Sequence, residues 1–201
     1  MPQTLEAWLD DLASSSPTPG GGAAAALLAA TGAALVGMVT NLTIGNPRYA
    51  SAEPLMIRVR DEAAELRTRA LGLAAADETA FGAVIAAYKL PKGDERTAAI
   101  QTALSGAARV PLELAGSAAR VIALAESIVD DANPNVISDV AVAADAARAA
   151  LTSARVNVEI NLAALRDPAV IAALSAELAG HLAAVEIADR VSARVRGKIA
   201  A

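Results

Sequence analysis

The sequence contains no cysteine, which excludes disulfide bonds, thiolate metal sites and a cysteine nucleophile. Aromatic residues are also scarce, with one Trp, one Phe and two Tyr among 201 residues. Because strands favour aromatic and β-branched side chains, this scarcity argues against a large sheet. The single histidine, His181, leaves no histidine pair for a metal ion. We therefore expect no metal site and interpret His181 as structural.

Basic side chains are few, and of the 17 present only three are Lys while 14 are Arg. The formal net charge of -5 argues against a nucleic-acid partner, which would need clustered positive charge. Glu6, Asp10 and Asp11 stand where a signal peptide would carry basic residues. Together with the lack of cysteine, these residues indicate a cytoplasmic protein.

Hydrophobic residues make up 55% of the chain, and alanine supplies about half of them. Small side chains allow helices to approach one another closely. We therefore expect an all-α fold, a bundle of about six helices that forms one domain over residues 1–201. Apolar periodicity and breaks at Gly and Pro predict helices over residues 3–13, 19–44, 51–90, 94–129, 138–166 and 168–198.

The second predicted helix is unusual because no charged residue lies between Asp11 and Arg48. Residues 22–39 are almost wholly Ala, Gly, Leu and Val, so this helix is apolar on every side and belongs in a protein core or a membrane. Its length is just sufficient to cross a bilayer. However, the polar residues Asn41 and Thr43 continue the same helix. We therefore favour a central buried helix and expect no membrane partner.

Three consecutive glycines, Gly20, Gly21 and Gly22, precede the alanine run. Thr18 can cap a helix with its hydroxyl, and Pro19 suits the first helical position. Glycines in the first turn leave the backbone N–H groups open, and such a helix start favours anions and electron-rich oxygens. No Gly-Lys-Ser/Thr follows, so this is not a Walker phosphate loop. The glycines either contact a substrate or simply let helices pack closely.

Asp77 follows Leu73 on the apolar stripe of the predicted helix over residues 51–90, which continues through Phe81, Val84 and Tyr88 and is expected to be buried. Burying a carboxylate there costs several kcal/mol unless it is paired or its pKa rises. One interpretation is a structural salt bridge to an arginine of a neighbouring helix. The other is a general base, or a carboxylate that stabilises a cationic substrate.

Further polar candidates lie on the predicted helix over residues 138–166. Asp139 falls in its first turn, where a carboxylate either complements the helix dipole or serves in catalysis. Asn157 and Asn161 are four residues apart and share one face. Their amides either join neighbouring helices or hydrogen-bond the edge of a bound heterocycle. Asn41 is open to the same two interpretations.

Distance along the chain limits how these candidates combine. Asp139 and Asn157 are 18 residues apart, which is about 27 Å along a straight helix, so they cannot line one small pocket in the same subunit. An antiparallel two-fold contact between subunits would bring them together. The large apolar face of the chain makes a homodimer the expected assembly. Lys92, in the turn after residue 90, is either a solvated charge or a contact for an anionic substrate tail.

Several segments together resemble one known family, in its order and at similar spacings. These are residues 16–22 with the alanine run, 38–45, 77–81, 88–92, 110–112, 135–139 and 155–162. Over about residues 5–195 the chain resembles the folate cyclodeaminase/cyclohydrolase family. Segments 41–45 and 135–139 look more like its stand-alone cyclohydrolase type.

The resemblance implies an all-helical subunit that forms a homodimer, with the folate pocket partly at the subunit contact. It implies hydrolysis of 5,10-methenyltetrahydrofolate to 10-formyltetrahydrofolate. The alternative within the family is ring closure of formimino-tetrahydrofolate with release of ammonia. An alternative of another class is a non-catalytic helical protein that binds folate or another partner.

The resemblance also suggests a role for each candidate residue. The methenyl carbon carries delocalised positive charge, so one carboxylate can act as base to water and as partner to the cation, and Asp77 is preferred over Asp139. The expected folate-binding residues are Asn157 and Asn161 at the pterin edge, Gly20, Gly21 and Gly22 at a substrate oxygen, and Lys92 and Arg48 at the glutamate tail. A tetrahydrofolate derivative is then the substrate, and no cofactor is expected.

Overall fold

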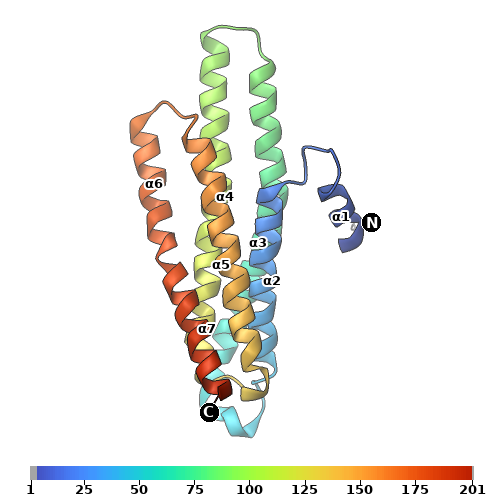
Figure 1. The fold of residues 1–201 in the computed structure, drawn as a ribbon, viewed down its shortest axis with the longest axis vertical. Coiled ribbons are helices and arrows are strands. Elements are labelled where there is room, and N and C mark those ends of the chain that lie inside the picture. Colours follow the sequence, from blue (N-terminus) through green and yellow to red (C-terminus); the bar gives the residue numbers. More distant parts are fainter. Residues whose placement is uncertain (1–3, 201) are drawn as a thin grey trace.

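The computed structural model describes residues 4–200, and every regular element in this range is helical (Figure 1). The α-helices are α1 (Leu5–Leu12), α2 (Gly21–Asn41), α3 (Glu53–Lys89), α4 (Asp94–Ile128), α5 (Ile137–Leu162), α6 (Pro168–Leu182) and α7 (Ala184–Ala200); the 3-10 helices are η1 (Pro47–Ala52) and η2 (Pro134–Val136). The predicted all-α bundle is confirmed. Gln3, at the start of the predicted first helix, lies outside the described residues.

Helix α2 lies at the centre and packs against α3, α4 and α5. Its small side chains permit this close approach. At Gly32 an added methyl group would lie 2.9 Å from the Ala143 carbonyl oxygen and 3.3 Å from the Ala147 amide nitrogen of α5. Only glycine therefore fits where α2 meets α5. The predicted central Ala/Gly-rich buried helix is confirmed.

By length and composition alone, three helical segments within residues 4–200 are apolar enough to cross a membrane. They are Gly21–Asn41, Pro47–Lys89 and Pro168–Ala200. In the first segment, 56% of the residues in its 18-residue apolar stretch are buried inside the bundle, whereas in each of the other two segments only 17% are buried. Helix α2 thus covers its apolar surface with neighbouring helices, while the other two segments leave much of theirs on the outside of the subunit.

The start of α2 differs from the prediction. The helix begins at Gly21, with Gly20 as its N-cap in an extended conformation. The Thr18–Pro19 peptide bond is cis, and Ser16 Oγ donates a hydrogen bond of 2.7 Å to the Thr18 carbonyl oxygen. The expectation that Thr18 caps the helix and Pro19 opens it is therefore wrong, because both residues belong to the preceding loop.

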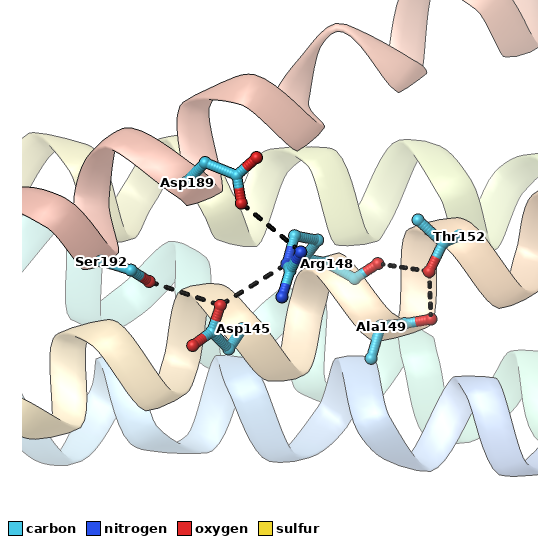
Figure 2. A network of polar contacts seen from close by, with 6 residues as sticks. All are labelled: Asp145, Arg148, Ala149, Thr152, Asp189 and Ser192. Atoms are coloured by element: carbon cyan, nitrogen blue, oxygen red, sulfur yellow. Dashed lines mark hydrogen bonds and ion pairs between the residues drawn. The ribbon is translucent and has the colours of Figure 1, made fainter.

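The predicted last helix, over residues 168–198, is in fact two helices separated at Ala183. The break lets α6 pack chiefly on α4 and α7 pack chiefly on α5. Figure 2 shows how polar contacts join α7 to α5. Arg148 of α5 lies 3.4 Å from Asp189, and Ser192 donates a hydrogen bond of 3.3 Å to Asp145.

The segments that join α2 to α3 and α4 to α5 meet at one end of the molecule, which we call the base. Asn133 connects them: its backbone N–H donates to Thr43 Oγ1 (3.1 Å) and its side-chain amide donates to the Leu42 carbonyl (3.0 Å). Its side-chain oxygen accepts from the Tyr49 hydroxyl (3.3 Å) and from the Asn135 backbone N–H (3.0 Å). Residues from the segments 41–45 and 135–139 therefore contribute to the hydrogen bonding of this base.

At the opposite end, the paired helices α3 and α4 extend beyond the start of α2 and the end of α5 (Figure 1). Over this part they form a two-helix hairpin, closed by the turn at residues 90–93. Large apolar side chains on the outer part of α3 are exposed, including Phe81 and Tyr88. The hairpin is therefore only partly covered by the rest of the subunit.

Candidate active site

A cavity of about 450 Å³ lies where this hairpin leaves the body of the bundle. The loop before α2 and the first turn of α2 form one wall, and α3, α4 and α5 form the others. Its lining residues are Pro17, Thr18, Gly20, Gly21, Gly22, Asp77, Ala80, Phe81, Val84, Tyr88, Leu104, Ala107, Asn157, Ile160 and Asn161. Six of the ten predicted site residues are in this set: Gly20, Gly21, Gly22, Asp77, Asn157 and Asn161.

Asp77 supplies the cavity with its carboxylate. Both carboxylate oxygens lie so close to Gly22 that a methyl group added there would overlap them. Burial, together with the negative charge of neighbouring Glu78, raises the pKa of Asp77 above its ordinary value. No cation and no hydrogen-bond donor among residues 4–200 pairs with this carboxylate. The salt-bridge interpretation of Asp77 is therefore wrong.

The first turn of α2 faces the same cavity with unpaired amides. No side chain caps this helix, and the first backbone hydrogen bond at its start runs from the Ala24 N–H to the Gly20 carbonyl (3.0 Å). The N–H groups of Gly21, Gly22 and Ala23 consequently have no acceptor within the described part of the chain. Such a helix start is suited to an anion or to a polarised oxygen.

Asn157 and Asn161 present one amide face from α5. Each side-chain nitrogen already donates a hydrogen bond, from Asn157 to the Ser153 carbonyl (2.9 Å) and from Asn161 to the Asn157 carbonyl (2.8 Å). Asn161 also reaches the Ala107 carbonyl of α4 at 3.5 Å. The side-chain oxygens accept no hydrogen bond from residues 4–200. Both amides can therefore accept hydrogen bonds from a ligand, and Asn161 also joins two helices.

A row of side chains on α3 continues from Asp77 along the cavity. Phe81, Val84 and Tyr88 follow at intervals of four, three and four residues, which places them on one helical face. The sequence pattern assigned this row to the buried core, and for the two aromatic residues that assignment is wrong: Phe81 is 42% exposed and Tyr88 is 49% exposed, whereas Val84 is partly buried against the core. A useful signal was their scarcity, because the chain has only four aromatic residues and two of them line this cavity.

The remaining predicted site residues lie elsewhere in the subunit. Asn41 ends α2 and Arg48 lies in η1, both towards the base. Asp139 is in the first turn of α5, also at the base, and Lys92 is exposed in the turn at the tip of the hairpin. None of these residues lines the cavity around Asp77.

A larger cavity of about 610 Å³ lies between α3, α4 and α6, but most of its charges pair with one another. Arg120 hydrogen-bonds Glu62 and thereby lowers the pKa of that carboxyl, and Arg69 lies 3.2 Å from Glu113. His181 fits against Gly116 on the same side. Size alone therefore does not identify the site, whereas the unpaired groups around Asp77 do.

Sequence comparison adds an independent observation. The sequence model of the formiminotransferase-cyclodeaminase family matches residues 4–180. The chain belongs to this family. The resemblance inferred from the ordered motifs is thus confirmed.

Individual members of the formiminotransferase-cyclodeaminase family resemble the chain over different lengths. A methenyltetrahydrofolate cyclohydrolase of Methylorubrum extorquens is 44% identical over 203 residues, covering 98% of both chains. A formimidoyltransferase-cyclodeaminase of Rattus norvegicus is 34% identical over 82% of this chain, which spans only 31% of that protein. The crystal structure of a formiminotetrahydrofolate cyclodeaminase from Thermotoga maritima superposes with a TM-score of 0.92 at 32% identity, covering 98% of both chains.

Proposed function

We propose that this protein hydrolyses 5,10-methenyltetrahydrofolate to 10-formyltetrahydrofolate. The observation that carries the proposal is the unpaired, half-buried carboxylate of Asp77, which faces the bare helix start at Gly22 inside a cavity of about 450 Å³. The full-length similarity to a relative named methenyltetrahydrofolate cyclohydrolase supports the same reaction.

The reaction begins at the carbon that bridges N5 and N10 of the folate, which shares a positive charge with both nitrogens. Asp77 stabilises this cation and accepts a proton from the water that attacks the carbon. The resulting adduct, which carries a hydroxyl on the former methenyl carbon, then collapses: the bond to N5 breaks and N5 receives the proton held by Asp77, while the hydroxyl proton is released to solvent as the C=O forms, so the carbon remains on N10 as a formyl group. Oxidation states do not change in this hydrolysis, so no redox cofactor takes part in the proposed step.

The unpaired groups opposite Asp77 have complementary tasks. The amides of Gly21 and Gly22 are placed to donate to an oxygen that gains negative charge as the adduct forms. The side-chain oxygens of Asn157 and Asn161 can accept hydrogen bonds from the N–H groups of the reduced pterin. Phe81 offers a flat apolar surface beside them.

The deciding experiment is the loss of methenyltetrahydrofolate absorbance in the presence of purified protein, corrected for hydrolysis in buffer. We expect an enzyme-dependent rate that saturates with substrate. A rate equal to the buffer background would contradict the proposal.

A second candidate is cyclodeamination of formimino-tetrahydrofolate, favoured by the similarity to the Thermotoga maritima cyclodeaminase. Ammonia release from that substrate, without hydrolysis of the methenyl compound, would establish it. A folate that raises the melting temperature without any turnover would instead indicate a binding protein.

We further propose that the protein acts as a homodimer in the cytoplasm. The apolar segments of α3 and α6 are only 17% buried within the subunit, which leaves surface for a second copy to cover. An antiparallel two-fold contact would also bring Asp139, Arg48 and Asn41 of one subunit towards the cavity of the other. Light scattering that gives twice the subunit mass of 20.1 kDa is the expected result.

A further inference from the structure

Arg96 lies in the first turn of α4, across the hairpin from the cavity-lining residue Tyr88. Its guanidinium carbon is 5.9 Å from the centre of the Tyr88 ring, within the range of a cation–π contact. The Nε atom of Arg96 is buried and has no hydrogen-bond partner among residues 4–200. No carboxylate in the same part of the chain pairs with this side chain.

Local helix structure does not account for a cation at this position. The first turn of a helix favours negative charge, which Asp94 and Glu95 provide. The positive charge of Arg96 in the same turn is unfavourable with respect to the helix dipole. A buried donor without a partner is unfavourable as well, because it loses its hydrogen bonds to water. The missing acceptor is therefore expected to come from outside the described chain.

The place of Arg96 relative to the cavity identifies the kind of acceptor. Tyr88 follows Asp77 by eleven residues on α3, about 16 Å along the helix axis. Along this distance the cavity presents a carboxylate at one end, the ring of Phe81 and the side chain of Val84 between, and the Tyr88 ring at the other end, where the Arg96 guanidinium lies against that ring next to the cavity lining. A complementary ligand has a cation, then a flat apolar group, then an anion.

We propose that Arg96 binds the carboxylates of the glutamate tail of the folate, with the Tyr88 ring holding the guanidinium in place. The inference rests on the proposed function, because a methenyl-folate has its cationic carbon, aminobenzoyl ring and glutamate carboxylates in this order. The sequence predicted Lys92 and Arg48 as the residues that bind the glutamate tail, and the inference assigns the tail to Arg96 instead. Lys92 is exposed at the tip of the hairpin, and Arg48 lies towards the base.

The test compares two substrates in the Arg96→Gln variant: methenyl-tetrahydrofolate and the methenyl-tetrahydropteroate that lacks the glutamate. With the first substrate, we expect KM to rise about 10- to 100-fold, the usual effect of losing hydrogen bonds to a charged group, while kcat stays within about twofold. With the second substrate, wild type and variant should have the same KM. Arg109→Gln, an exposed arginine of the same helix, is the matched control and should change neither value.

Two results would overturn the assignment. An unchanged KM for methenyl-tetrahydrofolate excludes contact with the tail, and an equal rise for both substrates shows that Arg96 is merely structural. The conservative variant Arg96→Lys should recover only part of the affinity, because it keeps the charge but loses the planar pair of donors.

Failure of the proposed function is recognised separately, since wild type would then turn over neither substrate. In that case the same comparison is made by calorimetric binding of tetrahydrofolate and tetrahydropteroate. A preference of wild type for tetrahydrofolate that disappears in Arg96→Gln supports the assignment, and no difference between the two proteins overturns it.

Discussion

The base of the bundle and the cavity carry similar polar side chains but satisfy them differently. At the base, Asn133 donates through its backbone and side-chain N–H groups, and its side-chain oxygen accepts two further bonds. At the cavity, the carboxylate of Asp77 and the amide oxygens of Asn157 and Asn161 receive no donor from residues 4–200. A satisfied polar network stabilises a fold, whereas a cluster of unpaired groups is ready for a ligand. This difference predicts opposite consequences for mutations at the two ends.

The largest expected effect is at Asp77. Asp77→Asn removes the proton acceptor with little change in shape, so kcat should fall about a thousandfold. The measurement is the hydrolysis rate of methenyl-tetrahydrofolate, with circular dichroism to confirm the helical fold. Asp61→Asn, on the same helix and exposed, is the matched control and should retain full activity. A fully active Asp77→Asn variant would place the base elsewhere.

The next effect concerns the contact between Gly22 and Asp77. Gly22→Ala forces the carboxylate to rotate away from the helix start, so activity should fall about a hundredfold. Stability should be unchanged or higher, since alanine is the better helix former. Gly37→Ala, in the same helix with nothing within 4 Å of the new methyl group, is the control for helix propensity. Equal activity in the two variants would contradict the role of this contact.

A paired experiment separates the two ends directly. Asn133→Ala breaks the hydrogen-bond network of the base and should lower the free energy of unfolding by about 2 kcal/mol, with a normal rate in the folded protein. Asn157→Ala should instead raise KM about tenfold, because its oxygen is proposed to bind the pterin, with little loss of stability. Urea denaturation at fixed protein concentration and steady-state kinetics provide the two measurements. Similar losses of stability in both variants would remove the distinction between the ends.

The smallest effect is the dependence on pH. Because burial and Glu78 raise the pKa of Asp77, its ionised form is disfavoured in the folded protein, and kcat/KM should fall as the pH drops through this raised pKa. Glu78→Gln removes the neighbouring negative charge and should move this limb to lower pH.

The same shift has a consequence for stability. The contribution of Asp77 is present below its unfolded pKa of about 3.9 and is lost as the pH rises through the folded value. Asp77→Asn should therefore melt at a slightly higher temperature than wild type at neutral pH, and this difference should vanish in acid. A constant difference at all pH values would show that the substitution acts through packing instead.

Much of the fold could be predicted because composition and helix breakers act locally. The charge-free alanine run predicted the central helix, and residues such as Pro91, Gly93 and Pro168 mark where helices begin and end. The start of α2 was misplaced, since Thr18 and Pro19 satisfy the rules for a helix start but lie in a loop. Local rules identify the residues that can start a helix. They do not determine at which of several neighbouring candidates the helix starts.

The cavity was predictable only in part. Asp77 was recognised because a carboxylate interrupted an apolar stripe, and Asn157 and Asn161 because their spacing places them on one face. Periodicity also assigned Phe81 and Tyr88 to the core, because it identifies a helix face but not what covers that face. Whether a face meets another helix, a second subunit or a ligand depends on the lengths of all the helices together.

Those lengths have a functional consequence in the hairpin formed by α3 and α4. Asp77 contacts Gly22 at the start of α2, whereas Tyr88 is near the end of α3 and Arg96 near the start of α4. This end of the hairpin extends beyond the start of α2 (Figure 1). A small swing of the tip therefore displaces Tyr88 and Arg96 much more than Asp77. Such a swing keeps the contact between Asp77 and Gly22 but changes the distance from Asp77 to Arg96. The length of ligand that fits between these two residues therefore depends on the position of the tip.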